Sequence, residues 1–159
     1  MIYKLSFIIL CALILINCKT ETPPSVEAEK EEVRQFFKEW VGFINSRSLE
    51  KFDEFWVENP DASLIVPEKR EAIISYNNIK QYYSEKIAEF DSLEYNLWDP
   101  TIWVSPTKSE AQVNFMAKRK IIFKNGFIIE FDPVRSSALL LKFGGKWKVL
   151  NLHESTQAK

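Results

Sequence analysis

The chain has 159 residues, of which 46% are apolar, including 12 Phe, 5 Tyr and 5 Trp, so it can bury the core of one domain. This composition excludes a disordered or collagen-like chain. With 21 basic and 22 acidic residues the net charge is −1, which excludes a basic nucleic-acid binder. One His and two Cys are too few for a zinc cluster or a disulfide framework, so we predict neither a metal nor a cofactor.

The first 17 residues have the layout of a cleaved export signal. Lys4 precedes a run over residues 5–16 that is apolar apart from Ser6. A run of twelve residues is too short to cross a bilayer as a helix, which needs roughly 20. We therefore predict a signal peptide over residues 1–17.

The segment that follows is similar to the lipobox of bacterial lipoproteins. It reads Leu15-Ile16-Asn17-Cys18, with Asn17 where Gly, Ala or Ser is usual, and a polar stretch follows. The resemblance implies cleavage before Cys18 and acylation of its thiol, which would anchor the protein in the bacterial cell envelope, at the outer membrane or facing the periplasm. Ordinary secretion, or retention as an uncleaved anchor, are the alternatives. Residues 18–30 are predicted to be a flexible tether.

Three helices are expected at the start of the folded domain, which we place at residues 31–156, with 157–159 as a tail. Apolar residues from Val33 to Ile44 recur at helical spacing. A second helix follows Ser48 and ends before Asn59-Pro60, and a third is capped by Asn77 or Asn78. Short strands are expected at 62–66 and 72–75, between the second and third helices.

After Asp91 the apolar period changes from helical spacing to two, which predicts four long antiparallel strands. They cover residues 93–104, 111–123, 134–143 and 146–154, with turns at Lys124-Asn125-Gly126 and Gly144-Gly145. Helices grouped on one face of such a sheet make an α+β layer fold. A three-residue loop at Gly144-Gly145 would place Phe143 opposite Trp147, and we prefer this register because a two-residue loop would place Lys142 there. The same register pairs four further positions, Leu141 with Val149, Leu139 with Asn151, Ser137 with His153 and Arg135 with Ser155.

The element order and the ending resemble the NTF2-like superfamily, in particular its SnoaL-like domains and the calmodulin-kinase association domain. Members commonly end in Gly-x-Trp-x-Ile/Val followed by His-x-Ser, as in Gly145-Lys146-Trp147-Lys148-Val149 and His153-Glu154-Ser155 here. The Asn45-x-x-Ser48-Leu49 junction and Asp61-Ala62-Ser63 also look like the family. The resemblance implies a cone of helices on a curved antiparallel sheet, on residues 30–156. It implies no single chemistry, because the fold hosts enzymes, binding modules and assembly domains.

Two residues are the candidates for chemistry. His153 is the only His of the chain and lies in a row that we expect to face inward, where it could act as a general base. Arg119 interrupts an apolar alternation, so its guanidinium could bind an anion inside a pocket. The plainer interpretations are a structural His, and an Arg that pairs with an internal Glu or Asp or reaches solvent at a bulge.

Six further residues are candidates for lining a ligand site. Aromatic rings with one acid gather on the first long strand, and the same residues could instead be core or dimer contact. The candidates are Tyr95, Trp98, Asp99, Trp103, Arg135 and Asn151. Ketosteroid isomerase, a relative within the superfamily, uses a Tyr donor and an Asp base. The resemblance puts Trp40 and Val66 at those positions, so that activity is not expected.

We therefore expect a lipid-anchored NTF2-like protein that is not an enzyme. It would bind a small apolar or weakly anionic molecule or act as an assembly module. A homodimer is expected through the open sheet face, where we place Met116, Ile122, Leu140, Leu150 and Leu152. The alternative is a cofactor-independent lyase or isomerase with His153 as base and Arg119 as anion clamp, which requires both side chains to reach one cavity.

Overall fold

The computed structural model describes residues 25–156. Within this range, the backbone of Asp99 is described but its side chain is not. The predicted signal peptide, Cys11, Cys18 and the 157–159 tail lie outside the described residues. None of the helices in the described part of the chain is long and apolar enough to cross a membrane.

Helix α2 (Val26–Ser46) is longer than the apolar spacing predicted and starts inside the expected tether. The side chain of Ser25 accepts a hydrogen bond from the backbone N–H of Ala28, which caps the first turn. Glu29 is buried there, and the Lys142 Nζ lies 2.5 Å from its carboxylate. The tether assignment is therefore wrong for residues 26–30, because a cap and a buried ion pair hold this polar sequence in a helix.

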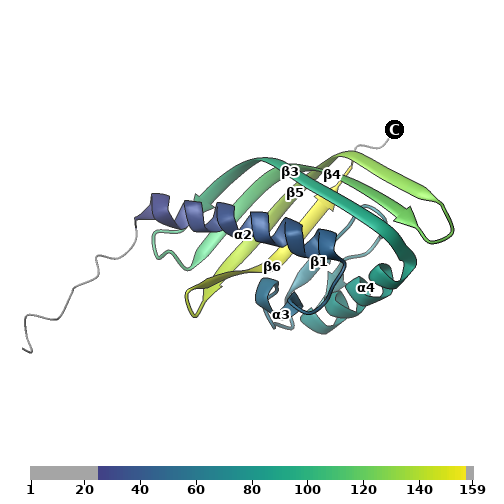
Figure 1. Ribbon diagram of the computed structural model, residues 1–159. Helices are drawn as coiled ribbons and strands as arrows, with labels where there is room; N and C mark the ends of the chain where they lie inside the picture. Colours follow the sequence, from purple (N-terminus) through teal and green to yellow (C-terminus); the bar gives the residue numbers. More distant parts are fainter. Residues whose placement is uncertain (1–24, 157–159) are drawn as a thin grey trace, which may run out of the picture.

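The other two helices pack beside the end of α2. Helix α3 (Phe52–Phe55) is a single turn. Helix α4 (Tyr76–Glu89) begins two or three residues earlier than expected, because Ser75 caps it by accepting from the N–H of Asn78. All three helices lie on the same side of the sheet (Figure 1). Their buried residues form one core with the inner face of the sheet, including Phe37 and Trp40 packed against Phe115 and Tyr95.

The sheet has six strands in the order β2-β1-β6-β5-β4-β3. The strands are β1 (Ser63–Ile65), β2 (Ile73–Ile74), β3 (Phe90–Val104), β4 (Glu110–Phe123), β5 (Ile128–Phe143) and β6 (Lys146–Ser155). All neighbours are antiparallel except β1 and β6, which run parallel. The predicted α+β fold, with helices before a curved antiparallel sheet, is confirmed (Figure 1). Strand β5 starts six residues earlier than expected and passes through the cis peptide bond before Pro133.

The predicted register of the β5–β6 hairpin is wrong near its turn. The loop has two residues, Gly144 and Gly145, both with positive φ, and Lys142 lies opposite Trp147. Lys142 is tolerated there because its Nζ pairs with Glu29 and Glu32 of α2 and lies 5.3 Å from the centre of the Trp147 ring. The charge that argued against this register thus has partners that come from another element.

A bulge between Leu139 and Leu140 then shifts β6 by one residue. The predicted pairs Leu139–Asn151, Ser137–His153 and Arg135–Ser155 are therefore confirmed. The two-residue loop places Leu140 of β5 on the inner face. The bulge then reverses which side chains of β6 face inward beyond Leu150, because two consecutive residues of β6 oppose one step of β5. Leu140 and Leu152, expected on the outer face, are buried in the core, whereas Met116, Ile122 and Leu150 are half-buried.

Candidate functional site

Arg119 lies on the inner face of the sheet, in phase with the apolar residues of β4. It pairs with Tyr95 of β3 and Phe131 of β5, and its guanidinium lies 4.9 Å from the centre of the Phe131 ring. The residue is 8% exposed. Its Nη1 donates to Glu154 at 3.1 Å and its Nη2 donates to Glu68 at 2.6 Å. The inward position predicted from the alternation is confirmed, and so is the interpretation that it pairs with an internal acid.

Glu154 is the buried partner of Arg119. The β6 bulge turns it inward, where its side chain is 3% exposed and its second oxygen accepts from the Tyr95 hydroxyl at 2.7 Å. Burial raises the pKa of Glu154 above its ordinary value, although the Arg119 charge and the Tyr95 hydrogen bond act in the opposite direction. Burial also raises the pKa of Tyr95, and the Glu154 charge adds to the effect, so its hydroxyl stays a donor.

Glu68 reaches the same guanidinium from outside the sheet. It belongs to the loop between β1 and β2, and its side chain is 23% exposed. Its second oxygen accepts from the Tyr82 hydroxyl of α4 at 2.7 Å. Burial, and then the Glu68 charge, raise the pKa of Tyr82. Two glutamates and two tyrosines thus surround one buried cation.

These side chains form the polar end of a cavity of about 50 Å³ between the helices and the sheet. The other walls are mainly apolar, and the lining residues are Trp40, Phe43, Ile44, Ser48, Val66, Glu68, Tyr82, Tyr83, Lys86, Ile87, Phe90, Leu93, Tyr95, Arg119, Ile121 and Glu154. Two buried donors among them, Trp40 Nε1 and Arg119 Nε, have no acceptor within residues 25–156. A buried N–H without a partner is costly, so a molecule that brought an acceptor to either group would be favoured. The indole N–H groups of Trp56 and Trp147, which do not line the cavity, are unpaired as well within the described residues.

His153 does not reach this cavity. The expectation that it faces inward is wrong, because the bulge in β6 turns it to the outer face, where it is exposed. There it borders an open groove of about 420 Å³ with Arg135, Thr101 and Asn114. His153 and Arg119 thus lie on opposite faces of the sheet. The lyase or isomerase alternative required them in one cavity, and the geometry does not support that pair.

The other predicted ligand residues are divided between the two faces. Tyr95 lines the cavity, whereas Trp98 and Trp103 are exposed on the outer face of β3. Asn151 donates to the Ser63 hydroxyl at 2.6 Å and is not part of the cavity wall. The side chain of Asp99 lies outside the described part of the chain. The irregular pairing of β3 between Trp98 and Thr101 interrupts the alternation that grouped these residues in the sequence.

Sequence reasoning missed Glu68, Glu154, Tyr82 and Trp40 as site residues. Glu154 follows His153 directly in the sequence. A bulge in β6 decides which of the two side chains faces inward, and the regular alternation of the strand does not predict that bulge. Trp40 and Val66 occupy the positions that the ketosteroid isomerase comparison had marked, and both line the cavity. Nothing in the local sequence connects Glu68 to Arg119, because a loop brings them together.

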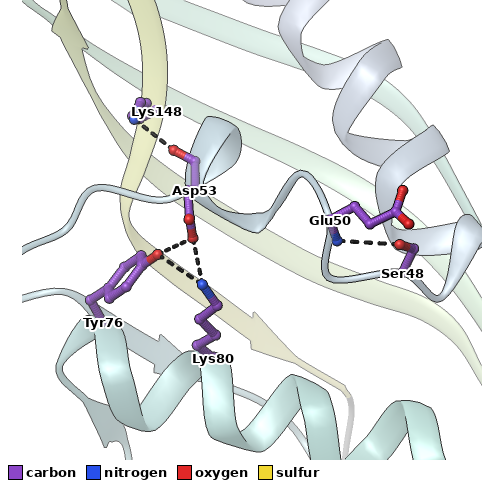
Figure 2. Close-up of polar contacts among 6 residues, drawn as sticks. All are labelled: Ser48, Glu50, Asp53, Tyr76, Lys80 and Lys148. Atoms are coloured by element: carbon purple, nitrogen blue, oxygen red, sulfur yellow. Dashed lines mark hydrogen bonds and ion pairs between the residues drawn. The ribbon is translucent and has the colours of Figure 1, made fainter.

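A second polar cluster lies on the outside of the helices (Figure 2). Asp53 of α3 accepts hydrogen bonds from the Tyr76 hydroxyl and from the Lys80 Nζ, the latter at 2.7 Å. Lys148 of β6 donates to the Asp53 backbone carbonyl at 2.6 Å. The Asp53 side chain is 69% exposed, and the bonds from Lys80 and Tyr76 lower its pKa. This cluster ties α3 to α4 and β6 and borders no enclosed cavity among those described.

Within residues 25–156, no three His, Cys, Asp or Glu side chains gather in a way that could hold a metal ion. The residues that line the cavity supply hydrogen-bond donors, carboxylates and apolar walls.

The sequence model of the SnoaL-like domain matches residues 33–159. An NTF2-like superfamily protein from Salmonella enterica serovar Typhimurium superposes with a TM-score of 0.75 at 19% identity, over 85% of this chain and 95% of that one. A candidate dehydratase of the NTF2-like family from Streptomyces avermitilis superposes with a TM-score of 0.73 at 12% identity, over 84% and 99%.

The association domain of CaMKII from C. elegans superposes with a TM-score of 0.63 at 15% identity, over 82% of this chain and 98% of that one. At these identities the solved structures establish the fold alone. A search of curated proteins finds no match to this chain.

Proposed function

Since the chain belongs to the SnoaL-like domain family, which has ligand-binding and some enzymatic members, we propose that it is a non-catalytic binding protein for a small, mainly apolar molecule. The molecule would occupy the cavity between α2, α4 and the sheet. One observation carries the proposal. In a cavity with mainly apolar walls, the buried N–H groups of Trp40 and Arg119 have no acceptor within the described residues.

The size of the cavity restricts how binding can occur. At about 50 Å³ it has room for a few water molecules. Sites for drug-sized ligands are usually about 300–1,000 Å³. Binding must therefore be coupled to a displacement of lining side chains, and the exposed end of the cavity wall is where such a displacement costs least.

A neutral probe with one acceptor tests this proposal. Trans-cinnamamide has an apolar ring and a single carbonyl, and its binding should raise the thermal unfolding temperature in proportion to occupancy. The Leu93→Trp variant, which places bulk in the cavity wall, should abolish the shift. Leu97→Trp is the matched control, because Leu97 lies four residues along the same strand, also half-buried, and does not line the cavity. No shift in the wild type, or an equal shift in Leu93→Trp, would contradict the proposal.

The outer sheet face supports a second proposal, that two copies of the chain form a homodimer. Trp103 and Trp98 of β3 are 55% and 37% exposed on this face, and Met116 and Leu150 are half-buried. Exposed aromatic side chains grouped on one face favour a protein contact. Some structural neighbours are association domains, which is consistent with an oligomer.

The dimer can be tested by light scattering after size-exclusion chromatography. Trp103→Ser should shift the mass from dimer to monomer. Phe127→Ser should not, because Phe127 is similarly exposed but lies in the β4–β5 turn. A wild-type monomer at high micromolar concentration would refute the dimer.

We propose that acylation of Cys18 anchors the protein in the bacterial cell envelope, which the lipobox-like Leu15-Ile16-Asn17-Cys18 supports. A mass spectrum of the detergent-extracted protein should show a chain that begins at an acylated Cys18. Cys18→Ser should move the protein to the aqueous fraction, whereas Cys11→Ser should leave it with the membranes.

A further inference from the structure

The two carboxylates that hold Arg119 are not equivalent. Glu154 is on a central strand, is 3% exposed and is fixed by a second hydrogen bond from Tyr95. Glu68 is on the β1–β2 loop, is 23% exposed and has the Tyr82 hydroxyl as its other partner. A strand residue within a buried network is much harder to displace than a loop residue at the cavity edge.

We propose that Glu68 is an exchangeable internal carboxylate, and that the ligand is a small carboxylic acid with an apolar body whose carboxylate takes the place of Glu68 on Arg119. This inference rests on the proposed function and specifies its ligand class. In the structure described here Glu68 occupies the position that the ligand carboxylate would take.

The hydrogen bonding of the guanidinium supports the exchange. Nε and Nη2 lie along the same edge of the planar group, and this edge matches the two oxygens of one carboxylate. Glu68 uses only half of the edge, because one of its oxygens accepts from Nη2 and the other accepts from Tyr82. The Nε of Arg119 has no acceptor among the described residues. A ligand carboxylate could bind both nitrogens at once, which Glu68 does not.

The charge balance supports it as well. One guanidinium already faces two carboxylates, so an added anion would be the third negative group near one cation. Replacing Glu68 with a ligand carboxylate keeps the number of charges constant. Glu68 can leave toward solvent, where its charge is hydrated, whereas Glu154 has no such path.

Displacement of Glu68 would also create the missing space. Glu68 and Tyr82 line the enclosed cavity and also an open groove of about 570 Å³ on their other side. Glu68 and Tyr82 thus separate the cavity from the groove. Lys69 and Arg70 border the groove together with two further acids, Glu71 and Glu85. Withdrawal of Glu68 would join the groove to the apolar cavity, with Arg119 at the junction.

The experiment compares two probes of matched shape. Isothermal titration calorimetry would measure the affinity of trans-cinnamate and trans-cinnamamide for the wild type, Glu68→Gln and Glu71→Gln. Glu71 is the matched control, because it is an exposed acid on the same loop and borders the groove but not the cavity. Glu68→Gln should bind trans-cinnamate about tenfold more tightly than the wild type, since a competing charge-assisted bond is removed. Glu71→Gln should change the affinity for trans-cinnamate less than about twofold. Neither variant should change the affinity for trans-cinnamamide by as much as Glu68→Gln changes the affinity for trans-cinnamate.

A second readout uses the wild-type protein, so that it does not depend on how a variant folds. The Nε–H resonance of Arg119, assigned with a ¹⁵N-arginine spectrum, should shift on addition of trans-cinnamate. Equal cinnamate affinity in the wild type and Glu68→Gln, or no Nε–H shift at saturation, would overturn the exchange. If trans-cinnamamide still binds in that case, the cavity proposal survives. If neither probe binds any of the proteins, both proposals fail.

Discussion

The molecule has two polar clusters of similar chemistry, and they differ mainly in burial. Each joins a carboxylate, a tyrosine hydroxyl and a cation. In the cavity these are Glu154, Tyr95 and Arg119, and on the helix surface they are Asp53, Tyr76 and Lys80 (Figure 2). Burial raises the pKa of Glu154, whereas hydrogen bonds lower the pKa of the exposed Asp53. The same bonds therefore have different consequences, because water replaces a lost partner only at the surface.

The largest effect is expected from Arg119→Met. This change leaves Glu154 buried without its cation, and it should lower the free energy of unfolding by about 3–5 kcal/mol. Urea denaturation would measure it. The double variant Arg119→Met/Glu154→Met should recover part of the loss, because no buried charge remains. A loss below about 1 kcal/mol in the single variant would mean that the cavity cluster behaves like the surface one.

Tyr95→Phe should have an intermediate effect. It removes the donor to one oxygen of Glu154, and the expected loss is about 1–3 kcal/mol, because the Glu154 side chain is only 3% exposed. Tyr76→Phe is the matched control on the surface, where Asp53 keeps Lys80 and solvent. Equal losses in the same denaturation experiment would show that burial does not separate the two clusters.

The two carboxylates should have opposite effects on the pH dependence of stability. The pKa of Glu154 is raised in the folded state, so the folded protein binds its proton more readily, and its contribution falls as pH rises above the ordinary value of 4.5. The pKa of Asp53 is lowered, so its contribution is present above 3.8 and is lost as pH falls through the lowered pKa. Urea denaturation between pH 3 and 7 would show both trends as differences from Glu154→Gln and Asp53→Asn. If the two variants differed from the wild type with the same sign of pH dependence, burial would not separate the two carboxylates.

The smallest effect is expected from Asp53→Asn near neutral pH. Exposed ion pairs contribute little, because water and salt screen both partners. The loss should be severalfold smaller than that of Tyr95→Phe and should shrink further in 1 M salt. A loss equal to that of Tyr95→Phe would show that the link between α3 and α4 is a main support of the fold.

Arg119 could be found from the sequence because a charge in an alternating apolar strand must either be paired or turn outward. Its partners could not. Glu154 and His153 are adjacent, and which of them faces inward depends on a one-residue bulge in β6. Glu68 comes from a loop 51 residues away from Arg119, and no periodicity reaches across such a gap.

The register of the β5–β6 hairpin also depends on a residue that is distant in the sequence. The sequence disfavours Lys142 opposite Trp147, because a lysine is poorly placed in an apolar row. The buried Glu29 at the start of α2 makes that position favourable, since it is 2.5 Å from the Lys142 Nζ. A rule that holds within one hairpin was overturned by a helix more than 100 residues earlier in the chain.

From the order and spacing of its residues alone, this chain determined its fold class, its helix and strand types and the inward position of Arg119. These properties follow from periodicity, which depends on near neighbours in the chain. Tertiary structure alone decided which acids meet Arg119, which face His153 occupies and how the cavity is closed. A bulge, a cap and a loop set these features, and each shifts side chains by one residue or joins distant segments, so local spacing does not encode them.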